Sequence, residues 1–129
     1  VLEVGLAAVS HDFELRAAFA NTLRALGRLD EALAEGRRAV SLAPGEPDAL
    51  DALGLVLLDR GEAAEALALF QRAVAIDGET LAYRENALAA LGRLGRRAEG
   101  CAAFAAIRAR GGTRDPAALA AAARLACGD

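Results

Sequence analysis

Three glycines, Gly27, Gly61 and Gly95, stand 34 residues apart and occupy the same place in three successive segments of the chain. The segments cover residues 13–46, 47–80 and 81–114, and each has a leucine four residues before the glycine and a glutamate four residues after it. A fixed period of this length is typical of chains that stack one supersecondary unit along an axis. The period therefore predicts a repeat architecture, in a single domain over residues 1–129.

Each segment divides into two amphipathic helices around its glycine. In the second segment Leu50, Leu53, Gly54 and Leu57 follow the spacing of one helix face. Gly61 is free to adopt the left-handed backbone conformation that ends a helix. The pattern predicts an all-α fold with helices over residues 12–26, 29–42, 48–60, 63–76, 80–93, 97–109 and 116–126.

Small residues recur where the paired helices are expected to cross. They are Ala20 and Gly54 at the eighth place of the segment, and Ala32, Ala66 and Gly100 at the twentieth. The third segment departs from this pattern, because Leu88 stands at the eighth place. We expect the third unit to pack with a shifted crossing, or to act partly as a cap.

The two flanks are interpreted as partial units. Residues 1–12 form a partial repeat in which residues 1–9 are the second helix of a preceding unit, and His11 occupies a turn or cap before the next helix. Residues 115–129 form a capping helix, with Asp115 as its N-cap and Pro116 at its first position. The chain has no methionine, so we expect a fragment or a processed product.

Composition excludes several classes of protein. The net charge is −3, and all 15 positive side chains are arginines spread over every segment, so the electrostatic footprint of a nucleic-acid-binding protein is missing. We attribute the absence of lysine to the codon bias of a GC-rich bacterium. No apolar stretch of about 18 residues lacks charges, so we expect no membrane span and a cytoplasmic location.

Chemistry-bearing residues are few. Cys101 and Cys127 cannot fill a zinc site, which needs four ligands. They form either a disulfide or two partly buried free thiols, and we favour free thiols. His11 has no accompanying nucleophile or second base. The sequence therefore predicts no catalytic residues, no cofactor and no metal.

The repeated residues resemble the tetratricopeptide repeat family over residues 13–114. The second segment matches the family pattern best, at Leu53, Gly54, Leu57, Gly61, Ala66, Phe70 and Ala73, and the first supplies Ala20, Gly27, Ala32, Ala39 and Pro44. Departures are Arg16, Leu50 and Arg84 at the tryptophan place, and Gly36 where an aromatic residue is expected. The resemblance implies a right-handed α-solenoid of antiparallel helix pairs, in which the first helices line a concave groove that holds a peptide or a partner's helix.

A helical wheel of residues 48–60 places Leu55 and Leu58 among carboxylates, on the face away from the Leu50/Leu53/Leu57 stripe. Across the three units the corresponding face carries five acids, including Glu14, against two arginines. We expect an acidic groove with an apolar spot, suited to a partner with Arg or Lys beside aliphatic side chains. The alternative is a solvated wall with two incidental leucines. The groove residues are Asn21, Arg24, Asp48, Asp51, Leu55, Leu58, Asp59, Glu85, Asn86 and Arg93.

The leading hypothesis is a non-catalytic scaffold that binds a protein or peptide. A second is a regulatory or targeting appendage of a larger bacterial enzyme. A third is self-assembly through the open N-terminal half-repeat, at Val1, Leu2, Val4 and Leu6.

Overall fold

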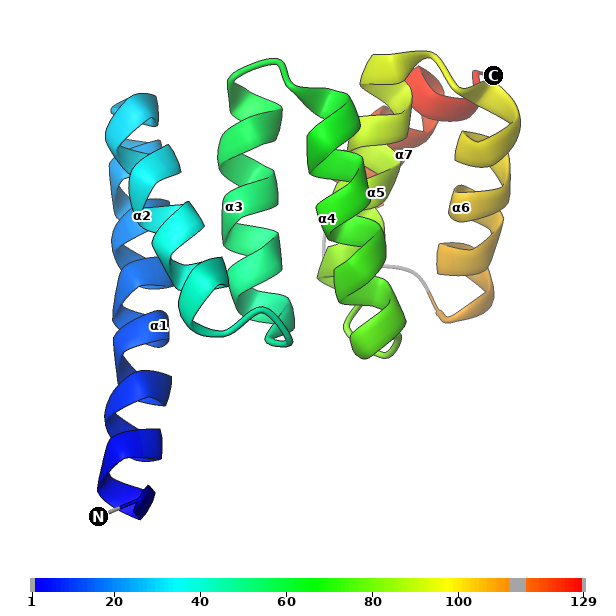
Figure 1. Ribbon diagram of the computed structural model, residues 1–129. Coiled ribbons are helices and arrows are strands. Elements are labelled where there is room, and N and C mark those ends of the chain that lie inside the picture. Colours follow the sequence, from blue (N-terminus) through cyan, green and yellow to red (C-terminus); the bar gives the residue numbers. More distant parts are fainter. Residues whose placement is uncertain (1, 112–115, 129) are drawn as a thin grey trace.

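The computed structural model describes the backbone of residues 2–111 and 116–128, and the side chains of residue 12 onward within those ranges. Seven helices account for most of this part of the chain, and successive helices run antiparallel (Figure 1). They are α1 (Leu2–Ala25), α2 (Leu29–Leu42), α3 (Pro47–Asp59), α4 (Ala63–Ile76), α5 (Leu81–Leu94), α6 (Arg97–Ala109) and α7 (Pro116–Cys127). The all-α prediction is confirmed, and apart from the start of α1 the predicted bounds differ by one residue at most.

The turn inside each unit closes in the same way, which explains the recurring glycine. The glycines adopt left-handed backbone angles, with φ of +79° at Gly27, +88° at Gly61 and +69° at Gly95. The amide that follows each glycine donates to the carbonyl oxygen of the buried, repeated leucine. These bonds are Arg28 to Leu23 at 2.9 Å, Glu62 to Leu57 at 2.8 Å and Arg96 to Leu91 at 3.1 Å. Such a pairing satisfies carbonyl groups that the helix end would otherwise leave free.

In the second unit the distance between the two helices depends on Gly54. A Cβ atom at this position would lie only 2.5 Å from the ring of Phe70, which is fully buried in α4. The aromatic ring therefore occupies the space that any larger residue at position 54 would need. Leu50 and Leu57 of α3, both fully buried, belong to the same core cluster.

The third unit is built differently. Leu88 is fully buried in α5 and clusters with Ile107 of α6 and with Leu119 and Ala126 of α7. The contact between α5 and α6 is less extensive than the contact inside the first two units, and α7 packs against both helices. The altered third unit predicted from Leu88 is thus confirmed: a leucine at the crossing separates the pair, and α7 fills the space.

Gly100 does not play the role expected of it. We predicted that it lies at the crossing of α5 and α6. Instead, a Cβ atom at Gly100 would lie 2.6 Å from the carbonyl oxygen of Ala126 in α7. The glycine permits close approach of the capping helix, because α7 packs against α6 at this point.

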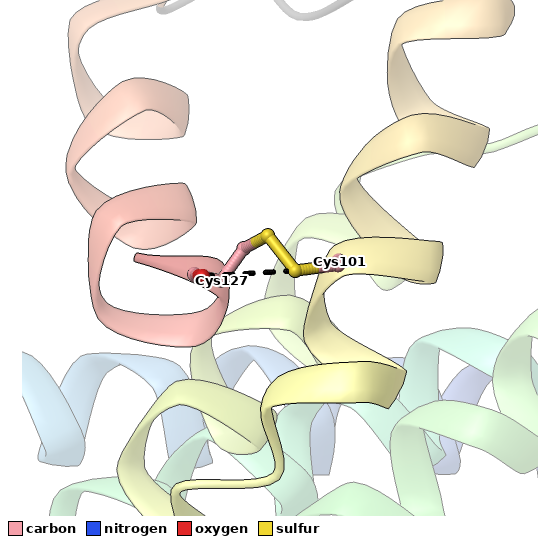
Figure 2. The surroundings of a disulfide bond; sticks show 2 residues. All are labelled: Cys101 and Cys127. Atoms are coloured by element: carbon pink, nitrogen blue, oxygen red, sulfur yellow. Dashed lines mark hydrogen bonds between the residues drawn. A yellow bond between two sulfur atoms is a disulfide. The ribbon is translucent and has the colours of Figure 1, made fainter. Parts of the chain in front are cut away.

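Cys101 and Cys127 form a disulfide between α6 and α7 (Figure 2). The expectation of two free thiols was wrong. Their Cα atoms lie 4.6 Å apart, within the range that a disulfide spans. The approach follows from the close packing at the neighbouring residues Gly100 and Ala126. Because the cysteines are 26 residues apart in sequence, only the docking of α7 brings them together.

The start of the chain also differs from expectation. Residues 1–9 were predicted to form a separate second helix of a preceding unit, but residues 2–25 form one continuous helix, α1. His11 therefore lies inside this helix and not before it. No glycine or proline interrupts residues 6–26, so nothing in the backbone ends the helix there. The predicted N-cap Asp115 lies outside the described residues, and Pro116 begins α7 as expected.

The contact between Gly54 and Phe70 predicts a large effect of one methyl group. Gly54→Ala should lower the free energy of unfolding by about 1–3 kcal/mol, because the added Cβ overpacks the interface. Thermal or urea unfolding measures this change. Gly45→Ala is the control, because a Cβ there has no neighbour within 4 Å. Equal losses in both variants would contradict the role assigned to Gly54.

The disulfide predicts a second change in stability. The double variant Cys101→Ser/Cys127→Ser should have a free energy of unfolding about 3 kcal/mol lower than the wild type. Without the disulfide, the unfolded chain has more conformational freedom. Reduction of the wild type should lower stability by a similar amount and should leave the double variant unaffected. A wild type that is indifferent to reduction would contradict the prediction.

Candidate functional site

Hydrogen bonds join the first helices of successive units, α1, α3 and α5. Four side-chain contacts link residues that are 35 positions apart, one more than the repeat period. They join Arg24 Nη1 to Asp59 Oδ2 at 3.3 Å, Tyr83 Oη to Asp48 Oδ1 at 2.5 Å, Asn86 Nδ2 to Asp51 Oδ1 at 2.7 Å, and Arg93 Nη1 to the carbonyl oxygen of Leu58 at 2.7 Å. We call this polar face the first-helix wall. It comprises Glu14, Asn21, Arg24, Asp48, Asp51, Asp59, Tyr83, Glu85, Asn86 and Arg93.

The structure brings most of the predicted groove residues together. Arg24 contacts Asp59, and Asn86 contacts Asp51, each across one unit boundary. Asn21 is exposed and Glu85 is half-buried. Neither has a hydrogen bond or an ion pair to another described residue. Most polar groove residues thus form hydrogen bonds with a neighbouring unit, whereas Asn21 and Glu85 form none with the described residues.

The expected apolar spot is wrong in its main feature. Leu58 is buried, with only 5 % of its surface exposed, and Leu55 is half-buried against the core. The helical wheel considered a single partner for α3. A helix inside a stack contacts the helices before and after it as well as its own partner, so α3 buries residues around most of its circumference.

Sequence reasoning missed Tyr83 as a wall residue. Its hydroxyl donates to Asp48, while its ring is buried. Burial, together with this hydrogen bond, raises the pKa of Tyr83 well above its usual range, so the hydroxyl is a neutral donor at physiological pH. The signal in the sequence was the separation of 35 positions from Asp48, which Asp51 and Asn86 share.

Asp51 is an acidic wall residue whose pKa is strongly raised. Burial raises its pKa to about 6, and the carboxylate of Asp48 adds to the rise. The hydrogen bond from Asn86 and the charge of Arg24 act in the opposite direction. Loss of hydration thus outweighs the two groups that stabilise the charged form.

The wall keeps a negative charge despite its hydrogen bonds. Asp48 and Asp51 accept from Tyr83 and Asn86, which are neutral donors. Arg93 donates to a backbone carbonyl group, and only Arg24 forms an ion pair, with Asp59. Five acids against two arginines leave a balance of −3 on this face when all are ionised. A face of this kind attracts positively charged groups.

Other sites in the described part of the chain are less developed. A largely apolar hollow of about 340 Å³ lies between α4, α5 and α6, lined in part by Val74, Ala87 and Leu91. No group of three or more histidine, cysteine or acidic side chains that could hold a metal ion is found among the described residues. No helix in the described ranges has the length and apolarity to cross a membrane.

The antiparallel helix pairs and the polar wall shared by successive units define a helical-repeat scaffold. Comparison with protein families agrees with this class. Residues 13–56 match one tetratricopeptide repeat model, and residues 48–82 match a second. These matches extend over residues 13–82, more than half of the chain, and the chain belongs to the tetratricopeptide repeat family. Repeats of this family generally mediate protein–protein interactions. No curated protein matches the sequence significantly.

The acidity of Asp51 predicts a pH-dependent stability. The pKa of Asp51 in the folded protein lies above the ordinary value of 3.8. The contribution of Asp51 to the free energy of unfolding is therefore fully present below about pH 4 and is lost as the pH rises through about 6. Asp51→Asn should therefore nearly match the wild type near pH 4 and exceed its free energy of unfolding by up to about 3 kcal/mol at pH 7. Urea unfolding at a series of pH values measures the difference.

A second variant checks the cause. Asn86→Ala removes the hydrogen bond that stabilises the carboxylate, so the pKa of Asp51 should rise further, as followed by NMR titration of the Asp51 carboxyl group. A difference between wild type and Asp51→Asn that does not depend on pH would contradict the assignment.

Proposed function

We propose that this protein is a non-catalytic scaffold that binds a protein or peptide segment on the first-helix wall, and that the segment carries arginine or lysine. The observation that supports the proposal is the state of Asp51. Its carboxyl group loses hydration beside a second carboxylate, while its closest hydrogen-bond donor, Asn86, is neutral. A cation placed at this point relieves both effects, because it favours the charged form of Asp51 and neutralises part of the wall.

The hydrogen bonds between units support the same proposal. They hold Asp48, Asp51 and Asp59 in fixed positions before any partner arrives. Fixed side chains lose little conformational entropy on binding, which favours affinity. Glu85 and Asn21 have no such bonds within the described residues and are available to a partner.

The structure supports fewer features of the expected partner than the sequence alone indicated. The aliphatic part of the expected partner relied on Leu55 and Leu58, and Leu58 is buried. We therefore propose that positive charge is the main determinant of recognition.

Binding of a basic peptide tests the proposal. A fluorescein-labelled peptide of alternating arginine and serine should bind with an affinity that falls by about tenfold in Asp51→Asn, equivalent to about 1.4 kcal/mol. Fluorescence anisotropy at fixed ionic strength measures the affinity. Because the cation favours ionised Asp51, binding should also tighten as the pH rises through about 6.

Glu65→Gln is the matched control, because Glu65 is an exposed acid of α4 whose removal changes the net charge by the same amount. Its affinity for the peptide should equal that of the wild type. Equal losses in Asp51→Asn and Glu65→Gln would mean that the peptide responds only to net charge, and the wall would not be the site.

A further inference from the structure

Exposed large apolar side chains gather at the two ends of the helix stack. Leu15 and Phe19 on α1 are 56 % and 51 % exposed, Leu26 in the turn directly after α1 is 65 % exposed, and Leu125 on α7 is 70 % exposed. The fifth such residue among those described, Ile76, lies elsewhere, at the end of α4. Four of these five residues therefore lie at the terminal helices, and one lies on an interior helix.

Leu15 and Phe19 lie on one face of α1, because a spacing of four positions matches the turn of a helix. Leu26, seven positions after Phe19, continues this face directly after the helix, where its amide still donates to the carbonyl oxygen of Thr22 at 3.1 Å. We call these three residues the α1 stripe. This face differs from the one that carries Asn21 and Arg24 on the first-helix wall. The stripe therefore belongs to a second surface of the molecule.

In the interior units, the face equivalent to the α1 stripe is covered by the preceding helix. Ala49 and Leu53 of α3, and Tyr83 and Ala87 of α5, occupy the places that Leu15 and Phe19 occupy in α1. All four are buried, because α2 packs on α3 and α4 packs on α5. The α1 stripe is thus the helix-receiving face of the first unit.

The size of the side chains in the α1 stripe limits which residues a helix packed on it can carry at the contact. Leu53, at the place of Phe19, packs against Gly36 of α2, where a Cβ atom would lie 3.2 Å from Leu53 Cδ1. A large residue on the receiving helix thus meets a small residue on the incoming one. Phe19 is larger than leucine, so its partner helix needs alanine or glycine at the contact.

No segment among residues 2–12 folds back over the stripe. These residues continue α1 along its axis, beyond the end of the neighbouring α2 (Figure 1). No helix of the described fold therefore covers the stripe.

The opposite end of the molecule presents a helix of the required kind. Ala117, Ala121 and Leu125 recur every four positions on one face of α7, and all three are exposed. A hollow of about 320 Å³ beside the stripe is lined by Asp12, Leu15, Arg16, Phe19 and Glu35. It has room for a leucine side chain. Arg124, next to Leu125, would then lie near the carboxylate of Asp12, whose side chain is 46 % exposed and also pairs with Arg16 at 3.6 Å.

We propose that copies of this chain associate head to tail, with α7 of one copy packed on the α1 stripe of the next. Ala117 and Ala121 permit close approach to Phe19, and Leu125 enters the hollow. The two surfaces are different, so every complex retains one free stripe and one free α7, and association continues beyond the dimer. The proposal uses neither the first-helix wall nor the residues 1–9 of the predicted half-repeat.

Sedimentation velocity over a range of protein concentrations tests the proposal. The wild type should form species of increasing size as the concentration rises. Phe19→Glu and Leu125→Glu should each remain monomeric, because each lacks one of the two surfaces. Ile76→Glu is the control and should associate like the wild type, since Ile76 is as exposed as Phe19 but lies outside both surfaces. Circular dichroism should show that every variant retains its helices.

Mixing the two monomeric variants gives the decisive result. Phe19→Glu retains an intact α7 and Leu125→Glu retains an intact stripe, so an equimolar mixture should form a dimer and nothing larger. A wild type that stays monomeric up to millimolar concentration would overturn the proposal. So would a mixture without dimers, or a Leu125→Glu variant that dimerises alone, which would mean that two stripes pair with each other. Asp51→Asn should associate normally, which keeps this test separate from that of peptide binding.

Discussion

The close approach of two helices at a small residue is the constraint on which this structure depends. In the second unit Gly54 leaves room for the ring of Phe70, and the two helices form a tight pair around a fully buried core. An alanine-rich chain has few large side chains to bury, so short distances between helices must supply the packing. Each unit then offers a face to its neighbour, and the stack extends by repetition of the same contact.

The third unit shows what happens when this constraint is relaxed. Leu88 stands where Gly54 stands one unit earlier, and α5 and α6 separate. The core at this end is completed by α7, which approaches closely at Gly100 and is tied to α6 by the disulfide. At this end of the described fold, a group of three helices replaces the regular helix pair. Disulfides persist in oxidising compartments, so the oxidation state of these cysteines in the cell bears directly on the cytoplasmic location predicted from the sequence.

The stacking also positions the polar wall. Because consecutive first helices lie one period apart, side chains 35 positions apart come within hydrogen-bonding distance, and the wall is held together by contacts between units. The same arrangement removes water from Asp51 and places it near Asp48, which raises its pKa. Stability and the electrostatic character of the wall therefore have a common origin in the repeat period.

The sequence by itself determined the helices, their order and the turns, because these depend on local patterns: a glycine at each turn, an apolar stripe on each helix and a fixed period. It also indicated, through Leu88, that the third unit would differ. Only the tertiary structure decided which surfaces of each helix remain exposed. Leu58 was expected in solvent and is buried, whereas Phe19 is exposed, because burial depends on how many neighbours a helix has in the stack. The pairing of Cys101 with Cys127 was likewise decided by the docking of α7, a contact between residues far apart in the chain that no local pattern encodes.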